Sequence, residues 1–505
     1  MSHSPIKSVV RAALFLALAL CPVVVLAHAR LLRSQPVADS KQRQPPSVVE
    51  LWFSEALEIV GSSVVVNDQS GRRVDKNNAA LSEGGKKLQV ELEDLAAGAY
   101  SVEWKALSVD GHAMSGKFGF SVAASQAAVP AATPPVQPTE PQASSPRMET
   151  HAGAEPAQES STGLALSLVR WLQYLAMLSL FGGFSLYLFV LAPALGDVSG
   201  EAPAAVARRA VALSWVSVAV LIPSSLVALV LEAGLVFDKG FGEALSPALL
   251  GQVITQTGFG GAWLLQLCSA VILAVILLFI GRGVRRAPSG HGQIWWAAMV
   301  VGALLLAAPS RTGHAAAAAK EYGLAEIADW LHLLAAGFWA GGLFHLALTA
   351  PTVLHMLDGK QRARVAQRTI RLFTRVAIPS VVLLTLTGLY NSWIHVESVA
   401  ALWGTAYGKT LLVKLLLVAI MLAVGAVNNF HFGPRAARLS DAGEGADATG
   451  LAGLERGLSR ALTLEALVAV AVLLVTSLLV YLAPARTHAA VSHYRVEQKI
   501  IQGRN

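Results

Sequence analysis

The chain has 505 residues, of which 54% are hydrophobic and only 14% are charged, whereas soluble domains average about 25% charged residues. This composition excludes an ordinary soluble enzyme and places much of the chain in a lipid bilayer. The two cysteines, Cys21 and Cys268, lie in separate apolar runs, which excludes a disulfide framework and a thiolate zinc site. A net charge of +7 is typical of proteins that bind nucleic acid, but the positions of the charges, described below, indicate another origin.

Residues 1–27 have the features of a secretory signal peptide. Lys7 and Arg11 precede an apolar run that ends at the small residue Ala27. Cleavage after Ala27 would make His28 the first residue of the mature protein. A terminal histidine offers its amine and an imidazole nitrogen as a chelate for Cu(II), which prefers nitrogen and oxygen ligands in a tetragonal arrangement. The alternative is that the cleavage point has no functional meaning.

Residues 28–123 are polar enough to be soluble, and short valine-rich or aromatic-rich stretches alternate with turn residues. The predicted strands are residues 47–53, 62–66, 87–92, 99–106 and 117–122. Turns are predicted at Gly61, Asn67, Gly71, Gly84 and Gly98. Short strands, frequent turns and the lack of a helical stretch predict an all-β sandwich of immunoglobulin-like size.

The rest of the chain divides into a linker, a membrane domain and a tail. Residues 124–160 are rich in Ala, Pro, Gln, Ser and Thr, which predicts a disordered or extended linker. Residues 161–485 contain about eight apolar stretches near the length that crosses about 30 Å of hydrocarbon, and predict an all-α polytopic domain. The predicted spans are residues 164–193, 208–235, 256–281, 293–310, 324–350, 372–395, 409–431 and 459–484. Residues 486–505 form the predicted tail.

The positive charges indicate how these spans are oriented. Most arginines and lysines of the domain lie in loops after the odd-numbered spans, whereas the other loops hold little beyond Lys239, Arg311 and Lys320. The positive-inside rule then places the odd-numbered loops in the cytoplasm and both ends of the mature protein outside. A cleaved signal peptide independently requires an external N-terminus. The net positive charge is therefore a signal of membrane topology, and no nucleic-acid partner is expected.

A metal site is predicted where two strands between Tyr100 and Val122 pair around an Asp110-Gly111-His112 turn. Asp110 and His112 are two residues apart, so their side chains leave the same face of an extended backbone. With the amine and imidazole of His28 they offer three nitrogens and one oxygen, a set that suits Cu(II) and is poor for the softer Cu(I). An Asp-Gly-X turn on its own is also a common loop.

These features resemble the CopC copper-binding proteins, whose mature domains begin with histidine and carry a D-G-H turn between two strands. The resemblance covers residues 28–122 and implies a Greek-key β-barrel or sandwich. It also implies a single Cu(II) site formed by the terminal amine, His28, Asp110 and His112. Some CopC proteins add a methionine-rich Cu(I) site, which is not expected here because Met114 is the only methionine of this domain.

Residues 164–484 resemble the CopD-like copper-transport membrane proteins. A Gly-His-Ala turn at residues 313–315 precedes a helix that runs from Asp329 through His332 and Trp339 to Gly341-Gly342. CopD-like proteins show a similar turn and a helix of the form D-x-x-H-x-x-A-x-x-x-W-x-G-G. Together the two resemblances imply a CopC domain followed by a CopD membrane domain.

Polar side chains in and beside the spans are candidate ligands along a copper path, in which Cu(I) is a further candidate species. These candidates are His314, Asp329, His332, His345, His395, His431 and Glu465. Asp329 and His332 share a helix face near the predicted outer end of span five, where His314 and His395 could join them. His345 lies about 20 Å deeper along the same helix. Ionisable groups in a bilayer mark ion pathways or buried structural pairs, and caps at helix ends are the alternative for several of them.

The leading hypothesis is a non-enzymatic copper importer of the bacterial inner membrane. Its periplasmic domain would capture Cu(II), with periplasmic copper carriers as candidate partners, and its helices would pass copper toward the cytoplasm. The alternatives are copper sequestration for resistance without transport, a cytochrome-b-like redox protein that uses the histidines of the spans, a copper-dependent oxidase, and a membrane-anchored sensor or buffer.

Overall fold

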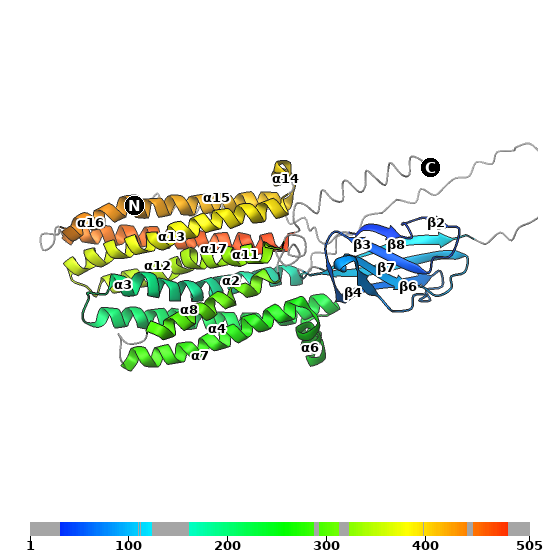
Figure 1. Ribbon diagram of the computed structural model, residues 1–505, viewed down its shortest axis with the longest axis horizontal. Helices are drawn as coiled ribbons and strands as arrows, with labels where there is room; N and C mark the ends of the chain where they lie inside the picture. Colours follow the sequence, from blue (N-terminus) through cyan, green and yellow to red (C-terminus); the bar gives the residue numbers. More distant parts are fainter. Residues whose placement is uncertain are drawn as a thin grey trace, which may run out of the picture. The chain divides into compact units, whose positions relative to one another are not determined.

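The computed structural model describes residues 31–109, 111, 113–123, 161–286, 292–312, 323–396, 398–441 and 448–482. The chain forms two compact units, a β-domain built by its N-terminal part and a helical domain built by the rest (Figure 1). This division follows the change in composition along the sequence.

The β-domain is a sandwich of two four-stranded sheets, in the orders β1-β3-β6-β5 and β2-β8-β7-β4. The strands are β1 (Leu31–Gln35), β2 (Lys41–Gln42), β3 (Val48–Phe53), β4 (Leu57–Asp68), β5 (Ala80–Ser82), β6 (Lys87–Glu91), β7 (Gly98–Ser108) and β8 (Ala113–Val122). All neighbours are antiparallel except β2 and β8, which pair in parallel. The predicted sandwich is confirmed.

Alternating apolar residues form the core between the two sheets. Every second residue of β3 is buried, and its last residue, Phe53, meets Trp104 of β7 edge to face with ring centroids 5.3 Å apart. The Tyr100 hydroxyl donates a hydrogen bond to the carbonyl of Ala96 at 2.8 Å, the arrangement that ties a loop to a strand in many sandwiches. A face of aromatic and branched side chains therefore stabilises each sheet on the other.

The strand prediction differs from the structure in two ways. Gly61 was expected in a turn, but it lies inside the twelve-residue strand β4 with φ of 88°, where the register with β7 shifts. A bulge of this kind uses the freedom of glycine and keeps the strand continuous on both sides. Strands β1, β2 and β5 were not predicted, because each is short and mixes polar with apolar residues.

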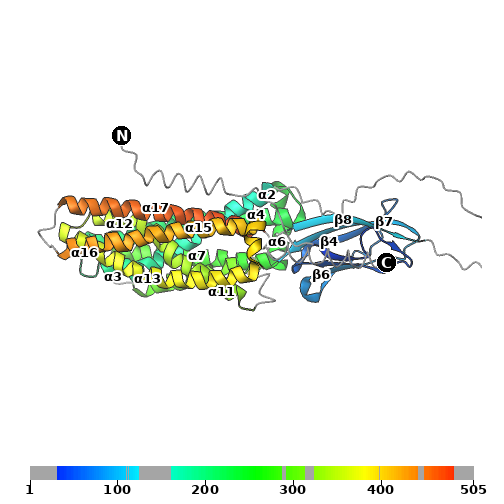
Figure 2. The same ribbon diagram turned by 90° about the horizontal axis from the view of Figure 1, so that it is seen from above.

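The described residues of the helical domain include eight helices that are long and apolar enough to cross a membrane. They run over Gly163–Ala194, Glu201–Phe237, Gly258–Val284, Gly292–Ser310, Ala325–Leu354, Gly359–His395, Ala406–Asp441 and Thr449–Val480. The eight predicted spans are confirmed, and several helices extend beyond them because their arginine-rich ends continue the helical turns. Figure 2 shows these helices running alongside one another.

The spans are built from elements that the figures label separately. These elements are α2 (Ser161–Leu186), η2 (Tyr187–Leu191), α3 (Ala192–Ala194), α4 (Glu201–Phe237), α7 (Gly258–Arg286), α8 (Gly292–Leu305), α9 (Ala307–Ser310), α11 (Ala325–Ala336), η3 (Gly337–Gly341), α12 (Gly342–Leu354), α13 (Gly359–His395), α15 (Ala406–Val427), η4 (Asn428–Phe432), α16 (Gly433–Asp441) and α17 (Ala448–Tyr481). Shorter helices lie between them, namely α5 (Phe241–Ala244), α6 (Pro247–Gln256) and α14 (Val399–Gly404). Elements η2, η3 and η4 are π-helical turns inside longer α-helices.

Glycines bring two spans into backbone contact. A Cβ atom on Gly182 of α2 would lie 2.1 Å from the carbonyl carbon of Gly341 in η3. A Cβ on Gly341 would in turn lie 1.9 Å from the carbonyl oxygen of Leu178. Small residues permit this close approach between membrane helices, and here they hold span one against span five.

The two ends of the helical domain differ in charge. At one end, which we call the basic end, lie α3, the start of α13 and α16 (Figure 1), with Arg364, Arg368 and Arg435 among its residues. Arg368 forms an ion pair with Asp197 at 2.6 Å. The opposite end carries α6 and α14.

Candidate functional site

Two of the predicted copper ligands, Asp110 and His112, fall in the sequence between strands β7 and β8. These strands pair from Gly98↔Val122 to Leu107↔Ala113, so the connection between them contains the Asp-Gly-His sequence. Gly111 has a φ of 86°, a conformation that glycine adopts without strain and that suits a tight turn. Asp110, His112 and His28 themselves lie outside the described residues.

The strand register brings the start of β1 and the end of β7 to the same end of the sandwich. Leu31 of β1 is paired with Phe53 at the end of β3, and Leu57 at the start of β4 is paired with Ser108 at the end of β7. Only three residues connect Phe53 to Leu57, so these two pairs lie no more than about 14 Å apart along the chain. His28 precedes Leu31 by three residues in the sequence.

In the helical domain, His332 of α11 faces the neighbouring helix α13. Its Nδ1 lies 2.9 Å from the hydroxyl oxygen of Thr387, and that hydroxyl donates its proton to the carbonyl of Leu383 at 2.6 Å. Because the hydroxyl has a single proton, Nδ1 of His332 must be the donor to Thr387. Nε2 of the neutral ring then keeps its lone pair, which is the state in which histidine binds a metal.

Charged and aromatic groups surround this histidine. Asp329 lies one turn earlier on α11 and is close enough to interact electrostatically with Lys414 and Tyr407 of α15. Lys414 also interacts with His332. His395, at the end of α13, meets the Tyr407 ring with centroids 6.4 Å apart. Asp329, His332 and His395 therefore belong to the same region between α11, α13 and α15, which we call the polar cluster.

The polar cluster does not form a complete metal site among the described residues. In those parts of the chain, no group of three or more histidine, cysteine, aspartate or glutamate side chains is positioned to hold a metal ion. His314, the fourth member that the sequence suggested, lies outside the described residues.

His345 lies deeper in the domain and only 2% of its surface is exposed. Its Nε2 is 3.1 Å from the Ser179 hydroxyl of α2, which in turn accepts a hydrogen bond from the Ser217 hydroxyl of α4 at 3.0 Å. A Cβ on Gly183 would lie 2.4 Å from Cε1 of the imidazole, so the ring occupies space that only glycine leaves free. Among the described residues Nδ1 of His345 has no hydrogen-bond partner.

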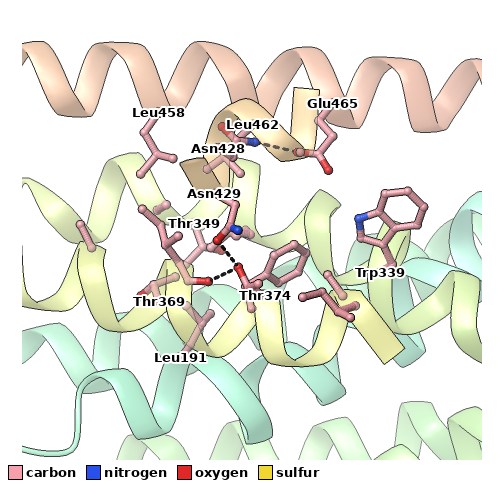
Figure 3. Close-up of a pocket in the computed structure, with 18 of the residues that line it drawn as sticks. Leu191, Trp339, Thr349, Thr369, Thr374, Asn428, Asn429, Leu458, Leu462 and Glu465 are labelled. Carbon is pink, nitrogen blue, oxygen red and sulfur yellow. Dashed lines mark hydrogen bonds between the residues drawn. The ribbon is translucent and has the colours of Figure 1, made fainter. Parts of the chain in front are cut away.

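Glu465 and His431, the last two candidates, lie in different surroundings. His431 is exposed and its ring contacts the neighbouring Phe432. Glu465 of α17 is buried and accepts a hydrogen bond from Nδ2 of Asn428 at 2.7 Å. Glu465 lines a mainly apolar cavity of about 360 Å³ (Figure 3), and His431 is not among its lining residues. The structure therefore does not bring these two side chains into one site.

Sequence reasoning missed Lys414 and Thr387. Lys414 could have been found, because a lysine within an apolar span is expensive and usually has an acidic partner. Thr387 carries no such signal, since a threonine in a membrane helix commonly bonds only its own backbone. Its contact with His332 depends on how α11 packs on α13.

Comparison with known proteins finds three family models along the chain. They are the CopC domain at residues 31–123, the copper resistance protein D-like N-terminal domain at residues 160–324, and copper resistance protein D at residues 367–479. The copper transport protein CutJ of Bacillus subtilis (strain 168) is 27% identical over 417 residues, which cover 82% of this chain and 70% of that protein.

Shorter relatives match the two parts separately. Copper resistance protein C of Pseudomonas syringae pv. tomato is 33% identical over 116 residues, covering 22% of this chain and 91% of that protein. Copper resistance protein D of the same organism is 29% identical over 197 residues, covering 38% of this chain and 60% of that protein. The crystal structure of CopC from Methylosinus trichosporium OB3b is 28% identical and covers 20% of this chain and 100% of that chain, with a TM-score of 0.19.

Proposed function

Because the chain belongs to the copper-resistance family in which a CopC domain precedes a CopD-like membrane domain, we propose that it captures Cu(II) outside the bacterial inner membrane and passes copper toward the cytoplasm. The β-domain is the capture module in this proposal. The eight-helix domain is the route across the membrane, and its basic end faces the cytoplasm.

The observation that supports the capture step is the strand register of the β-domain. The start of β1 and the end of β7 lie at the same end of the sandwich. In the sequence, Asp110 and His112 follow the end of β7, and His28 precedes the first residue of β1 by three. We propose that the terminal amine and imidazole of His28, Asp110 and His112 bind Cu(II) there. Three nitrogens and one oxygen match the preference of Cu(II) and not that of Cu(I).

The polar cluster supports the second step. We propose that His332 receives copper through Nε2 while Thr387 holds the ring by its other nitrogen, an arrangement common in metal-binding histidines. Asp329 and His395 lie in the same region, and His345 is the next candidate ligand along the helix. Periplasmic copper carriers are the candidate donors to the capture site.

The capture site is tested by adding one residue before His28 in the mature protein. This extension moves the amine away from the imidazole and breaks the chelate, so we expect Cu(II) affinity to fall by at least a hundredfold in equilibrium titration. Replacement of Arg30 by lysine, which leaves the terminus unchanged, is the control. Equal affinity of the extended and native proteins would refute the terminal-amine ligand.

Transport is tested with the purified full-length protein in liposomes, supplied with Cu(II) or Cu(I) in separate experiments. We expect uptake that is lost in His332→Leu and retained in the surface variant His355→Leu. Intact Cu(II) binding by residues 28–123 without uptake of either ion would refute transport and favour copper sequestration instead.

A further inference from the structure

The helical domain contains a cavity beside Glu465 to which the proposed copper transport assigns no role. It lies among α12, α13, η4 and α17 of the helical domain (Figure 3), and all three π-helical turns contribute to its wall. Leu191 comes from η2, Trp339 from η3 and Asn428 from η4. A π-helical turn widens a helix locally and is frequent at functional sites. The presence of three such turns in one wall indicates that the cavity is a specific feature of the fold and not a packing defect.

The cavity opens toward the lipid-facing surface of the helical domain. Ile378 and Val382 of α13 line it and are 59% and 54% exposed, and Phe430 of η4 lines it and is 77% exposed. Apolar side chains that are exposed on a membrane span face lipid tails. A ligand would therefore reach the cavity from the bilayer, through the gap that these side chains border.

The inner wall presents hydrogen-bond acceptors. Nδ2 of Asn428 donates to Glu465, which turns the Asn428 carbonyl oxygen, Oδ1, the other way. Asn428 is nine-tenths buried, and among the described residues its Oδ1 has no hydrogen-bond partner. Leaving a buried acceptor unpaired is unfavourable, so a ligand that donates a hydrogen bond to it binds more tightly.

A second polar group, formed by Thr374 and Asn429, also lines the cavity. The Thr374 hydroxyl of α13 lies within hydrogen-bond distance of two acceptors, the carbonyl of Ile370 at 2.8 Å and Oδ1 of Asn429 at 3.1 Å, and Figure 3 shows Asn429 between Thr374 and Asn428. Trp339 and Phe373 add aromatic surface to the wall. The cavity thus combines two polar groups with flat apolar surfaces.

The donor set argues against copper as the occupant. The polar groups of the described lining residues are oxygen-bearing amides, hydroxyls and one carboxylate, with an indole N–H and no imidazole or sulfur. Cu(I) prefers soft sulfur ligands, and one carboxylate leaves most of the charge of Cu(II) uncompensated in an apolar cavity. The occupant that fits is a neutral, lipid-soluble molecule that brings its own hydroxyl donors.

We propose that this cavity binds a lipid-soluble hydroquinone taken from the bilayer. One ring hydroxyl donates to Oδ1 of Asn428, the second faces Thr374 and Asn429, and the apolar tail leaves between Ile378 and Phe430. A monoacylglycerol also carries hydroxyl donors on an apolar body, but it has no ring for Trp339 and Phe373 to contact. The oxidised quinone has the ring and lacks the donors.

The test measures retention of radiolabelled decylhydroquinone, kept reduced, by the full-length protein in nanodiscs relative to empty nanodiscs. We expect saturable binding, competition by unlabelled decylhydroquinone, and at least tenfold weaker competition by decylquinone, by the hydroquinone dimethyl ether and by monodecanoylglycerol. Loss of one hydrogen bond corresponds to about a tenfold change in affinity. Equal competition by the dimethyl ether or by monodecanoylglycerol, or the absence of saturable binding, would overturn the proposal.

Matched variants locate the binding in this cavity. Asn428→Leu removes the unpaired acceptor at similar volume and should weaken binding about tenfold. Thr374→Val should also weaken it, whereas Thr385→Val, on the same helix but outside the cavity, should not. Ala377→Trp fills the cavity and should abolish binding, while the lipid-facing Leu386→Trp should leave it unchanged. Thr374→Val loses only a hydroxyl, so the test stays decisive if Asn428→Leu fails to fold.

Unchanged binding in Thr374→Val and Ala377→Trp would refute the assignment to this cavity. None of these measurements includes a metal ion. A negative result here and a negative result for copper uptake are therefore separate findings.

Discussion

At the scale of single residues, neighbouring side chains hold several buried polar groups of the helical domain in one state. Thr387 sets the tautomer of His332, and Glu465 sets the direction of the Asn428 amide. Gly183 leaves room for the His345 ring. In each case the partner lies on a different helix, so the chemical state of the group depends on how the helices pack.

Gly183→Ala should destabilise the helical domain by about 1–3 kcal/mol, because the new methyl group would overlap the imidazole of His345 and force the ring or the helix to move. Thermal unfolding of the purified protein in detergent measures the effect. The control is Gly251→Ala on α6, where a Cβ meets nothing within 4 Å and alanine favours the helix. Equal stability of the two variants would contradict the close contact.

The β-domain contains a buried carboxylate whose charge contributes to stability. Burial alone raises the pKa of Asp75, but hydrogen bonds from the Arg73 side chain and from the backbone N–H groups of Val66 and Asn77 outweigh it and lower the pKa below its usual 3.8. A carboxyl with a lowered folded-state pKa stabilises the fold above the pKa of the unfolded chain. That contribution is lost as the pH falls through the folded-state pKa.

Asp75→Asn should therefore lower the unfolding free energy of residues 28–123 by about 1–3 kcal/mol at pH 7, because the ion pair with Arg73 is lost. The difference from the native domain should shrink below about pH 4 as the native carboxyl is protonated. Urea unfolding at both pH values measures it, with the surface variant Asp94→Asn as the control. A difference that stays constant with pH would mean that the charge of Asp75 does not stabilise the domain.

At the scale of elements, the structure depends on which face each helix turns toward its neighbours as well as on how long the helix is. Each of the π-helical turns η2, η3 and η4 contains one residue more than an α-helical turn, and therefore accommodates an insertion without rotating the helix that follows. The three turns also supply the wall of the cavity. Hydropathy predicted the spans but not these turns, since the residues of η2 and η3 are as apolar as their neighbours.

Deletion of Phe430 should be tolerated better than deletion of Leu416. Phe430 is exposed and lies in η4, so its removal converts the turn to an α-helix and leaves the flanking helix faces unchanged. Leu416 is also exposed but lies in the regular part of α15, where its deletion rotates one half of the helix by about 100° and turns buried residues toward lipid. We expect the second deletion to cost about 3 kcal/mol or more in thermal unfolding. A larger loss for the Phe430 deletion would contradict this account of η4.

At the scale of the whole molecule, the chain forms two units with separate cores, to which we assign the two steps of the proposed copper transport. The β-domain has its own sandwich core, whereas the helical domain has cores formed between spans. Nitrogen and oxygen ligands for Cu(II) are predicted in the first, and scattered histidines lie in the second. The positive charge of the helical domain is concentrated at the basic end, which the proposed orientation places in the cytoplasm.

The proposed orientation predicts the behaviour of reporter fusions. Alkaline phosphatase, which needs an oxidising compartment for its disulfides, should be active when fused after Val396 and inactive when fused after Asp441, because the first position follows an even-numbered span and the second an odd-numbered one. A cytoplasmic fluorescent reporter should give the opposite pattern and serves as the control. The reverse result would place the basic end outside and remove the basis for copper import.

The sequence by itself determined the division into a β-domain and a helical domain, the eight spans and the pairing of the two strands on either side of the Asp110-Gly111-His112 sequence. Those features are local, because alternation, apolar length and turn residues are each encoded within a few dozen residues. The Cu(II) ligand set with His28 stays a prediction. Only the tertiary structure decided that His332 meets Thr387, that Asp329 lies near Lys414, and that Asn428 and Glu465 share a cavity away from His431. These contacts join residues far apart in the sequence, and they depend on the rotation of each helix about its axis. That rotation is set by close packing at glycines and by the π-helical turns. The length and hydropathy of an apolar stretch do not encode it.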